Sequence, residues 1–247
     1  MIEDAVTRRM LLGAFLSLLP LAARAQGSLL NQGKSLLGTM GGSGSKLSDG
    51  EIGSGLKDAL NVASQRVVGR VGKTDGFWAD PAIRIPLPGP LEQISGPLKA
   101  VGASGMLDDL HVKMNRAVEA AAPKALGIFT GAVSKMSITD ARGILGGPKD
   151  AATQYFRRTT SGDLTTAFRP IVDSSLSSVG AVSAYKSVES KATTLPLAGS
   201  SLKGFNLTDY SVGKGLDGLF HYMAVEEEQI RTNPAARTTD LLKKVFA

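Results

Sequence analysis

From residue 48 onward, apolar residues recur at steps of three and four, the spacing of one face of an α-helix. The first such stripe is unbroken for about twenty residues: Ile52, Leu56, Ala59, Leu60, Ala63, Val67 and Val71. Ser48 and Glu51 precede it at the spacing of a capping box, and Gly72 follows its last member. The pattern therefore predicts a helix between Ser48 and Gly72.

The next segment, residues 73–90, has a different pattern. It contains prolines at positions 81, 86, 88 and 90, and proline favours extended backbone over helix. Apolar residues alternate between Ile83 and Leu87, which indicates that one side packs on the helices. The sequence thus predicts a Pro-rich extended loop that carries Trp78, the only tryptophan of the chain.

Helical spacing resumes after this loop and continues almost to the end. The predicted helices cover 90 to about 101, 105–122, 123 to about 136, 137–146 with Ser137 and Asp140 as caps, 148 to about 168, 171 to about 191, and a last long helix capped by Thr208 and stopped by Asn233-Pro234. Pro170 is expected to kink or break the helical stretch around it, residues 193–206 to form a loop, and Thr239 to cap a short final helix. The fold class is all-α: a single multi-helix, bundle-like domain over residues 48–247.

The start of the chain reads as an export signal rather than as part of the fold. Thr7-Arg8-Arg9 precedes an apolar run over residues 10–22, and Ala23-Arg24-Ala25 gives the small-x-small pattern of a cleavage site. The run is shorter than the ~20 apolar residues that span a bilayer, which disfavours a membrane anchor. We expect residues 1–25 to be a twin-arginine-like signal peptide, with the general secretory route as the alternative, and a periplasmic or otherwise exported protein without a transmembrane span in its mature chain.

Composition narrows the function classes. Residues 26–47 are rich in Gly and Ser and are expected to form a flexible leader. The chain has 28 Lys and Arg against 22 Asp and Glu without a block of basic residues, so no nucleic-acid partner is expected. It has no cysteine, which excludes disulfides, thiolate metal sites and cysteine nucleophiles. Hydrophobic residues make up 43% but aromatic residues only 5%, as in packed helices.

Motifs for common cofactor or nucleophile chemistry are missing. Only His111 and His221 could supply imidazole, and nothing in the pattern brings them together. The chain has no Gly-x-Ser-x-Gly elbow, and the glycine-rich segments 41–46 and 143–149 lack the ending and the preceding strand of a phosphate-binding loop. No metal and no cofactor are therefore expected.

A charge cluster near the end of the last long helix, Glu226-Glu227-Glu228, is unfavourable there because the carboxyl end of a helix carries partial negative charge. Glu226 and Glu227 flank the apolar stripe, and Arg157 lies at the edge of the inner face of its own helix. We expect Arg157 to pair with Glu226 or Glu227 across the helix interface, in which case Arg157→Ala would cost about 3 kcal/mol. A ligand site at these residues is the alternative.

The remaining candidates for a binding surface are groups that the pattern places outward or in the loop. They are Asp75, Trp78, Arg84 and Arg116, together with Tyr155 and Arg158, which are expected to point away from the core.

Several ordered motifs resemble one bacterial family of exported proteins, the domain of unknown function 4197. They are Gly72-Lys73-Thr74-Asp75-Gly76-Phe77, Arg84-Ile85-Pro86-Leu87-Pro88, Met114-Asn115-Arg116-Ala117, the run Ala151 to Thr160, Leu216-Asp217-Gly218-Leu219-Phe220 with Glu226-Glu227, and Ile230 to Pro234. The resemblance covers roughly residues 48–247. It implies a helical, exported bacterial protein and carries no assigned activity. Some members of the family are lipid-anchored, and this chain departs from them by lacking the cysteine.

Three hypotheses on function follow. The first is a non-enzymatic binding or envelope-associated protein that holds an apolar small ligand between its helices or docks an envelope protein through the loop around Trp78. The second is a hydrolase of sugars or phosphate esters that uses Asp75, Asp217 and Glu226 beside arginines. The third is a structural protein that self-associates.

Overall fold

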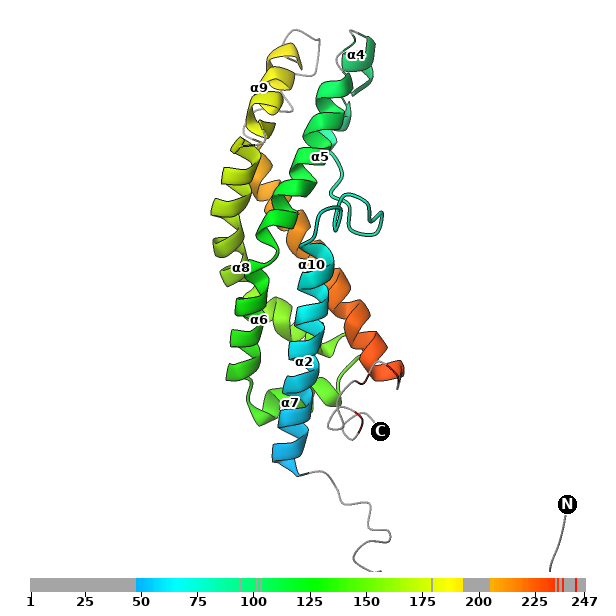
Figure 1. The fold of residues 1–247 in the computed structure, drawn as a ribbon, viewed down its shortest axis with the longest axis vertical. Helices are drawn as coiled ribbons and strands as arrows, with labels where there is room; N and C mark the ends of the chain where they lie inside the picture. The colour runs from blue at the N-terminus through cyan, green and yellow to red at the C-terminus, as the bar shows by residue number, and fades with distance from the viewer. Residues whose placement is uncertain are drawn as a thin grey trace, which may run out of the picture. The chain divides into compact units, whose positions relative to one another are not determined.

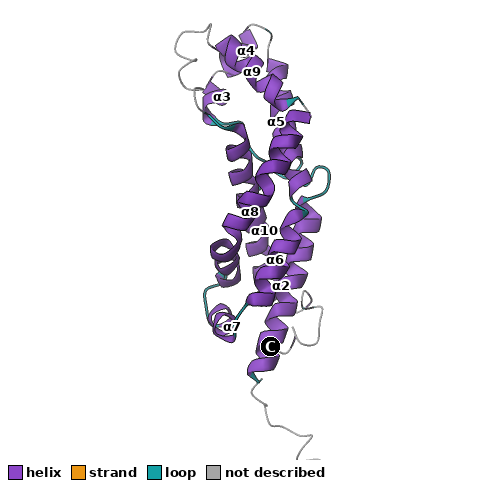
Figure 2. Ribbon diagram, turned by 90° about the vertical axis from the view of Figure 1, so that its left-hand side faces the viewer, coloured by secondary structure: helices purple, strands orange, loops and turns teal. Residues whose placement is uncertain are grey.

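The computed structural model describes residues 48–93, 95–100, 102, 104–178, 180–192, 205–233, 235, 237 and 243. Within these ranges every regular element is a helix, which confirms the predicted all-α class (Figures 1 and 2). The predicted signal peptide, the leader at 26–47, the residues 193–204 of the predicted loop and most of the predicted final helix lie outside the described residues.

The first helix, α2 (Asp49–Val71), is as predicted, and the expected signals set its ends. The hydroxyl oxygen of Ser48 accepts the N–H of Glu51, and the Glu51 carboxylate accepts the N–H of Ser48 at 3.0 Å. Its apolar stripe is buried from Leu56 to Val71, whereas the first turn with Ile52 is less covered. The helix ends at Gly72.

The next elements follow the predicted order with some corrected bounds. They are α3 (Gly89–Gln93), α4 (Ser95–Ala100), α5 (Ser104–Ala121), α6 (Lys124–Lys135), α7 (Ile138–Leu145), α8 (Ala151–Ser178), α9 (Ala181–Ala192) and α10 (Leu207–Thr232). The single helix predicted from 90 to about 101 is wrong, because α3 and α4 are two short helices. The capping box of Ser137 and Asp140 at the start of α7 is confirmed.

Pro170 was expected to kink or break its helix, and the break is wrong. α8 continues through Pro170 for eight further residues, to Ser178. Pro170 lies on the exposed side of the helix, where water can satisfy the carbonyl that its missing N–H leaves without a partner. The cost of the proline is thereby reduced, and the buried residues Phe168 and Val172 on either side keep the inner face continuous.

The predicted cap of the last long helix is also wrong. Asn206 caps α10, since its side-chain oxygen accepts the N–H of Asp209 at 2.9 Å. Thr208 lies inside the first turn, where its buried hydroxyl donates to Asp173 of α8 at 2.9 Å. The predicted stop at Asn233 is confirmed.

α8 and α10 are the longest helices, and they pack against each other (Figure 1). α5 and α6 also contact α8, while α2 contacts α6, α7 and α10. Five phenylalanines are completely or almost completely buried among these helices: Phe77, Phe129, Phe156, Phe168 and Phe220. None of the described helices has the length and apolar character that crossing a membrane requires.

Two glycines of α10 allow close approach of other elements. A Cβ atom at Gly215 would lie 2.5 Å from Val118 of α5. A Cβ atom at Gly218 would lie 2.5 Å from the ring of Phe77, in the loop that follows α2. Because real Cβ atoms do not come this close to other atoms, both positions require glycine, and α10 forms part of the seat of the loop.

Candidate functional site

The candidate site is the loop at residues 73–88 with the side chains of α2, α5 and α10 that hold it, and we call it the loop site. At its centre lies Glu119 of α5, which is 3% exposed. Its carboxylate accepts three backbone N–H groups of the loop, those of Asp75 at 3.2 Å and of Phe77 and Trp78 at 3.0 Å each. A buried charge with three backbone donors fixes the local path of the chain.

Arg116 links this carboxylate to the surface. Its guanidinium donates to Glu119 at 2.8 Å and to Asp75 at 2.7 Å, and these acceptors, Glu119 first, raise its pKa against the effect of burial. Asp75 has φ +68°, the one positive value among the described non-glycine residues. The left-handed backbone at Asp75, which is costly for a residue with a side chain, is thus held by hydrogen bonds at its N–H and at its carboxylate.

A second anchor fixes the Pro-rich part of the loop. The fully buried amide of Asn115 accepts the N–H of Ile85 at 2.8 Å and donates to the carbonyls of Ile85 at 3.0 Å and His111 at 2.9 Å. Nε2 of His111 donates to the same Ile85 carbonyl at 2.7 Å, since a carbonyl can only accept. Burial lowers the pKa of His111, which favours the neutral ring.

The outer surface of the loop presents an aromatic ring beside a cation. Arg84 is exposed and donates from Nε to the Trp78 carbonyl at 2.5 Å, with its guanidinium 4.9 Å from the centre of the Trp78 ring. The ring of His111 meets the half-buried Trp78 edge-on, with 4.9 Å between the ring centres. Trp and Arg are the residue types most enriched where proteins bind one another tightly.

The opposite flank of the loop is tied to α2 and α10 through Asp80. The Tyr222 hydroxyl donates to the Asp80 carboxylate, and Arg70 donates to Asp80 at 3.1 Å and to the Tyr222 oxygen at 2.7 Å. Burial alone would raise the pKa of Asp80, but the hydrogen bonds from Tyr222, the Ala82 N–H and Arg70 outweigh it, so the pKa lies below its usual value.

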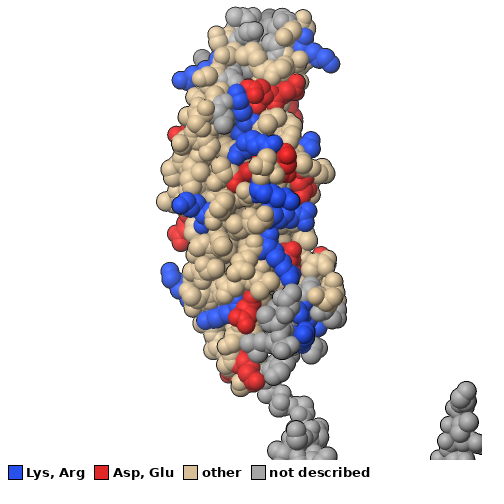
Figure 3. Space-filling model, in the orientation of Figure 1, with Lys and Arg blue, Asp and Glu red and all other residues tan. Residues whose placement is uncertain are grey.

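Cations lie farther out than most of their acidic partners at this site. The side chain of Arg70 is 51% exposed against 18% for Asp80, and that of Arg66 is 35% exposed against 22% for its partner Glu226. Figure 3 shows Lys and Arg side chains, with acidic groups between them, gathered over the region of the loop and α2. Arg70 and Lys73 line an open hollow of about 420 Å³ together with Asp75 and Asp80, so charges of both signs surround it, and of the two carboxylates only Asp75 is exposed.

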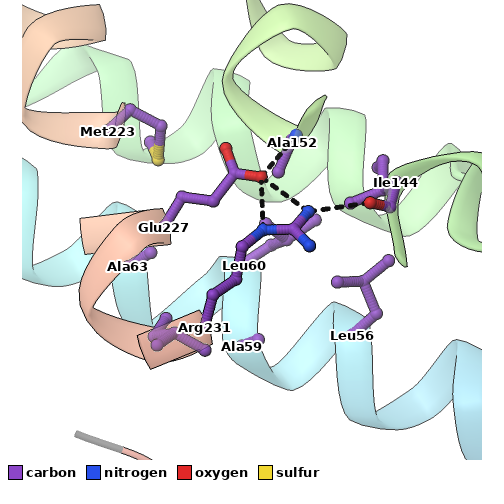
Figure 4. A pocket seen from close by; sticks show the side chains of 10 residues that line it. Leu56, Ala59, Leu60, Ala63, Ile144, Ala152, Met223, Glu227 and Arg231 are labelled. Atoms are coloured by element: carbon purple, nitrogen blue, oxygen red, sulfur yellow. Dashed lines mark hydrogen bonds and ion pairs between the residues drawn. The ribbon is translucent and has the colours of Figure 1, made fainter. Parts of the chain in front are cut away.

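Glu227 forms a different arrangement at the start of α8 (Figure 4). Its carboxylate accepts the N–H groups of Ala152 and Thr153 and the Thr153 hydroxyl, each at 2.9 Å. Arg231 donates to it at 2.9 Å and to the Ile144 carbonyl at 2.7 Å. The positive end of the α8 dipole offsets the unfavourable position of this glutamate near the end of α10.

The predicted pairing of Arg157 with Glu226 or Glu227 is therefore wrong. Arg157 instead lies on the surface, 54% exposed, 3.5 Å from Asp217 and with its guanidinium 4.5 Å from the centre of the Phe220 ring. Glu226 pairs with Arg66 at 3.3 Å. Glu227 is satisfied locally by Arg231, four residues later on the same helix.

A cavity beside Glu227 and Arg231 has a volume of about 20 Å³ and is lined mainly by apolar side chains of α2 and α10. This is room for about one water molecule. Sites for small organic ligands usually measure about 300–1,000 Å³. This cavity is thus too small for the apolar ligand that the sequence suggested between the helices.

The predicted outward position of Tyr155 is wrong as well. Its side chain is 6% exposed overall, its ring packs against Phe156, and its hydroxyl donates to the Ala132 carbonyl at 3.0 Å. Burial raises the pKa of Tyr155. Arg158 is exposed as predicted, with its guanidinium 5.8 Å from the centre of the Tyr155 ring.

The structure thus gathers one group of the predicted residues and separates the others. Asp75, Trp78, Arg84 and Arg116 lie together at the loop site. Asp217 and Glu226 each contact a cation of their own, and no described contact joins them to Asp75 as a pair of carboxylates.

Several residues of the site were missed by sequence reasoning: Arg70, Asp80, Asn115, Glu119 and Tyr222. Glu119 follows Arg116 by three residues, the spacing of an intrahelical ion pair, and this was a usable signal. No comparable pattern links Asp80 to Tyr222, which is 142 positions away. Among the described residues no three His, Asp or Glu side chains converge as a metal site would require.

Fold and site together define an all-α domain that holds a non-helical loop rigidly on its surface. The family model described as "Protein of unknown function (DUF4197)" matches residues 46–247, so the chain belongs to this family, as its motifs predicted. Neither the comparison with curated proteins nor the comparison with solved structures found a match.

Proposed function

We propose that this protein is an exported, non-enzymatic binding protein that recognises an anionic segment of an envelope protein through the loop site. The observation that carries the proposal is the fixation of the loop backbone by Glu119 and Asn115. A loop that is ordered before it binds loses less conformational entropy on binding, which is how rigid recognition loops gain affinity.

The outer surface of the loop supports this choice of partner. Trp78 and Arg84 offer a large ring and a guanidinium that are held against each other, and Lys73 and Arg70 add positive charge at the neighbouring hollow. Acidic side chains on a partner could therefore pair with exposed cations while an apolar group covers the indole ring.

Binding is favoured over hydrolysis by the state of the candidate carboxylates. Asp75 contacts Arg116, Asp217 contacts Arg157 and Glu226 contacts Arg66. A hydrolase with a carboxylate pair would need two of these groups on either side of one bond. The apolar-ligand form of the hypothesis lacks support from the mainly apolar cavity beside Glu227, which is too small.

The test is photo-crosslinking in the native host from position 82 of the full-length protein. Ala82 is exposed at the loop, so a photoreactive residue there would not disturb the core. We expect one envelope protein to be captured, through an acidic segment, and the captured amount to fall at least about tenfold with Arg84→Glu.

Matched controls make this result specific. A photoreactive residue at exposed Thr166 of α8 should capture nothing comparable, and Arg169→Glu, on the same helix, should leave the crosslink from position 82 intact. Equal capture by the Arg84→Glu protein would contradict the proposal. Recovery of the full-length protein in the cytosolic fraction would contradict the exported location.

A further inference from the structure

A separate groove lies between α6 and α8, away from the loop site. Its volume is about 500 Å³, within the usual range of small-molecule sites. Gly127 and Gly131 lie one turn apart on its α6 side, and a Cβ atom at either would meet no atom within 4 Å. Ile128 and Ala132 add apolar surface to the lining, and Tyr155 contributes from α8.

The groove contains an unusual cation. Every other arginine that the structure describes makes a hydrogen bond or an ion pair. Within the described part of the chain, Arg158 makes no hydrogen bond or ion pair: its guanidinium contacts the Tyr155 ring and lies close enough to the Asp140 carboxylate to lower the pKa of that group. Lys135, from α6, lines the same groove and likewise makes no ion pair with a described residue. Two cations here are thus available to an anionic group.

The acidic groups of the groove are not equivalent. The Asp140 carboxylate is occupied by the cap of α7, where it accepts the N–H of Ser137 at 3.1 Å and its hydroxyl at 2.6 Å. Those hydrogen bonds lower the pKa of Asp140. Asp163 of α8 lines the groove and makes no hydrogen bond or ion pair with a described residue. Among the described residues, the groove therefore offers two cations and one carboxylate that make no hydrogen bond or ion pair.

We infer that the α6/α8 groove binds a small zwitterionic molecule of the size and type of a short peptide. Its carboxylate would pair with Arg158 and Lys135, its ammonium group with Asp163, and an apolar side chain would cover Ile128 and Ala132. Arg158 and Asp163 are five residues apart, which separates their backbone positions by about 7.5 Å along the helix axis and about 140° around it, so the two charges suit the ends of a dipeptide better than those of a single amino acid.

The test is isothermal titration calorimetry of the full-length protein with alanyl-leucine. Its N-acetyl form, which lacks the positive charge, and its C-terminal amide, which lacks the negative charge, are the matched probes. We expect the unmodified dipeptide to bind at least about tenfold more tightly than either blocked form, since each loses one charge-assisted contact.

Three variants locate the site. Arg158→Gln and Asp163→Asn should each weaken dipeptide binding at least about tenfold, and Arg158→Gln should reduce the preference for the free dipeptide over its amide, because Lys135 alone is left to pair with the carboxylate. Gly131→Leu should abolish binding by filling the groove, while its thermal unfolding temperature is unchanged or higher, because open space surrounds the new Cβ and a helical glycine is replaced. Arg157→Gln, one residue away on the exposed side, is the control and should bind like the unmodified protein.

Several results would overturn the inference. They are the absence of binding heat with the unmodified dipeptide, equal affinity for the N-acetyl form, or full binding by a folded Gly131→Leu protein. Arg84→Glu, which tests the loop site, should leave dipeptide binding unchanged, so the two proposals fail independently.

Discussion

Two buried glutamates of this domain bind backbone N–H groups, but they stabilise different kinds of structure. Glu227 on α10 caps the first turn of α8, where a carboxylate meets donors that any helix leaves free. Glu119 on α5 instead accepts N–H groups from Asp75, Phe77 and Trp78, in a segment without regular structure. Each also has an arginine from its own helix, Arg231 and Arg116 respectively.

One glutamate therefore stabilises the core, and the other fixes the conformation of an exposed surface. The contact of Glu227 joins two long helices, so it stabilises the packing of the core. The contact of Glu119 joins a helix to a loop whose outer side carries Trp78 and Arg84, so its effect is to keep a surface in one conformation. Two buried carboxylates can therefore be distinguished by whether the backbone segment that each one binds carries exposed side chains.

The largest expected effect is that of Glu227→Ala. The change leaves the start of α8 without its cap and Arg231, which is 16% exposed, without its carboxylate. We expect a loss of about 3–5 kcal/mol in the free energy of unfolding, measured by urea denaturation. Glu228→Ala, at an exposed ion pair with Lys149, should change it by less than about 1 kcal/mol, and equal losses would refute the role of Glu227.

Glu119→Gln should act on the loop more than on the whole domain. An amide keeps one acceptor but loses the charge that binds Arg116, so we expect about 2 kcal/mol of destabilisation. Because Trp78 is the only tryptophan, its fluorescence reports on the loop directly, and quenching by acrylamide should increase. Asp108→Asn on the same helix is the control, and a quenching rate unchanged by Glu119→Gln would contradict the proposed anchor.

Tyr222→Phe should remove about 1 kcal/mol at pH 7 and less at low pH, where only the hydrogen bond from Arg70 to the hydroxyl is still lost. In the folded protein Asp80 has a lowered pKa, so its stabilising effect is present above the unfolded pKa of about 3.9 and is lost as pH falls through the folded pKa. Removing the hydroxyl returns the pKa of Asp80 toward its usual value. Urea denaturation at a series of pH values should show the two proteins converging in acid, and a constant difference would exclude this linkage.

The smallest effect is expected for Arg157→Ala. This arginine and its partner Asp217 are 54% and 59% exposed, and exposed ion pairs contribute little. With the contact to Phe220 included, the loss in a urea melt should stay below about 1 kcal/mol. Arg231→Ala, which removes the buried cation paired with Glu227, should lower the free energy of unfolding several times as much. A larger loss for Arg157→Ala than for Arg231→Ala would support the pairing that the sequence suggested.

The helices were predictable because their signals are local. Apolar spacing, the capping boxes at Ser48 and Ser137 and the stop at Asn233 each act within one or two turns. The prediction of Thr208 as the cap of α10 was wrong because of a tertiary contact: its hydroxyl donates to Asp173 of α8. The predicted break at Pro170 was wrong because the energetic cost of a proline inside a helix depends on its exposure, which the apolar periodicity does not report.

The loop site was predictable only in part. Its exposed residues, such as Trp78 and Arg84, stand out in a Pro-rich segment, whereas the anchors Glu119 and Asn115 look like ordinary polar residues of a helix. Their role depends on contacts across 30 to 44 positions of sequence. The predicted pairing of Arg157 with Glu226 or Glu227 was wrong for the same reason, because a helical wheel shows which face of its helix a residue occupies but not which residue of another helix it contacts.

The contact between Phe77 and Gly218 has a mechanical consequence. The ring lies where any side chain at position 218 would be, so the loop cannot move inward without displacing α10. Well-packed interiors have low compressibility and transmit strain. We therefore expect an inward push on the loop by a bound molecule to be transmitted along α10, and through Glu227 to the first turn of α8.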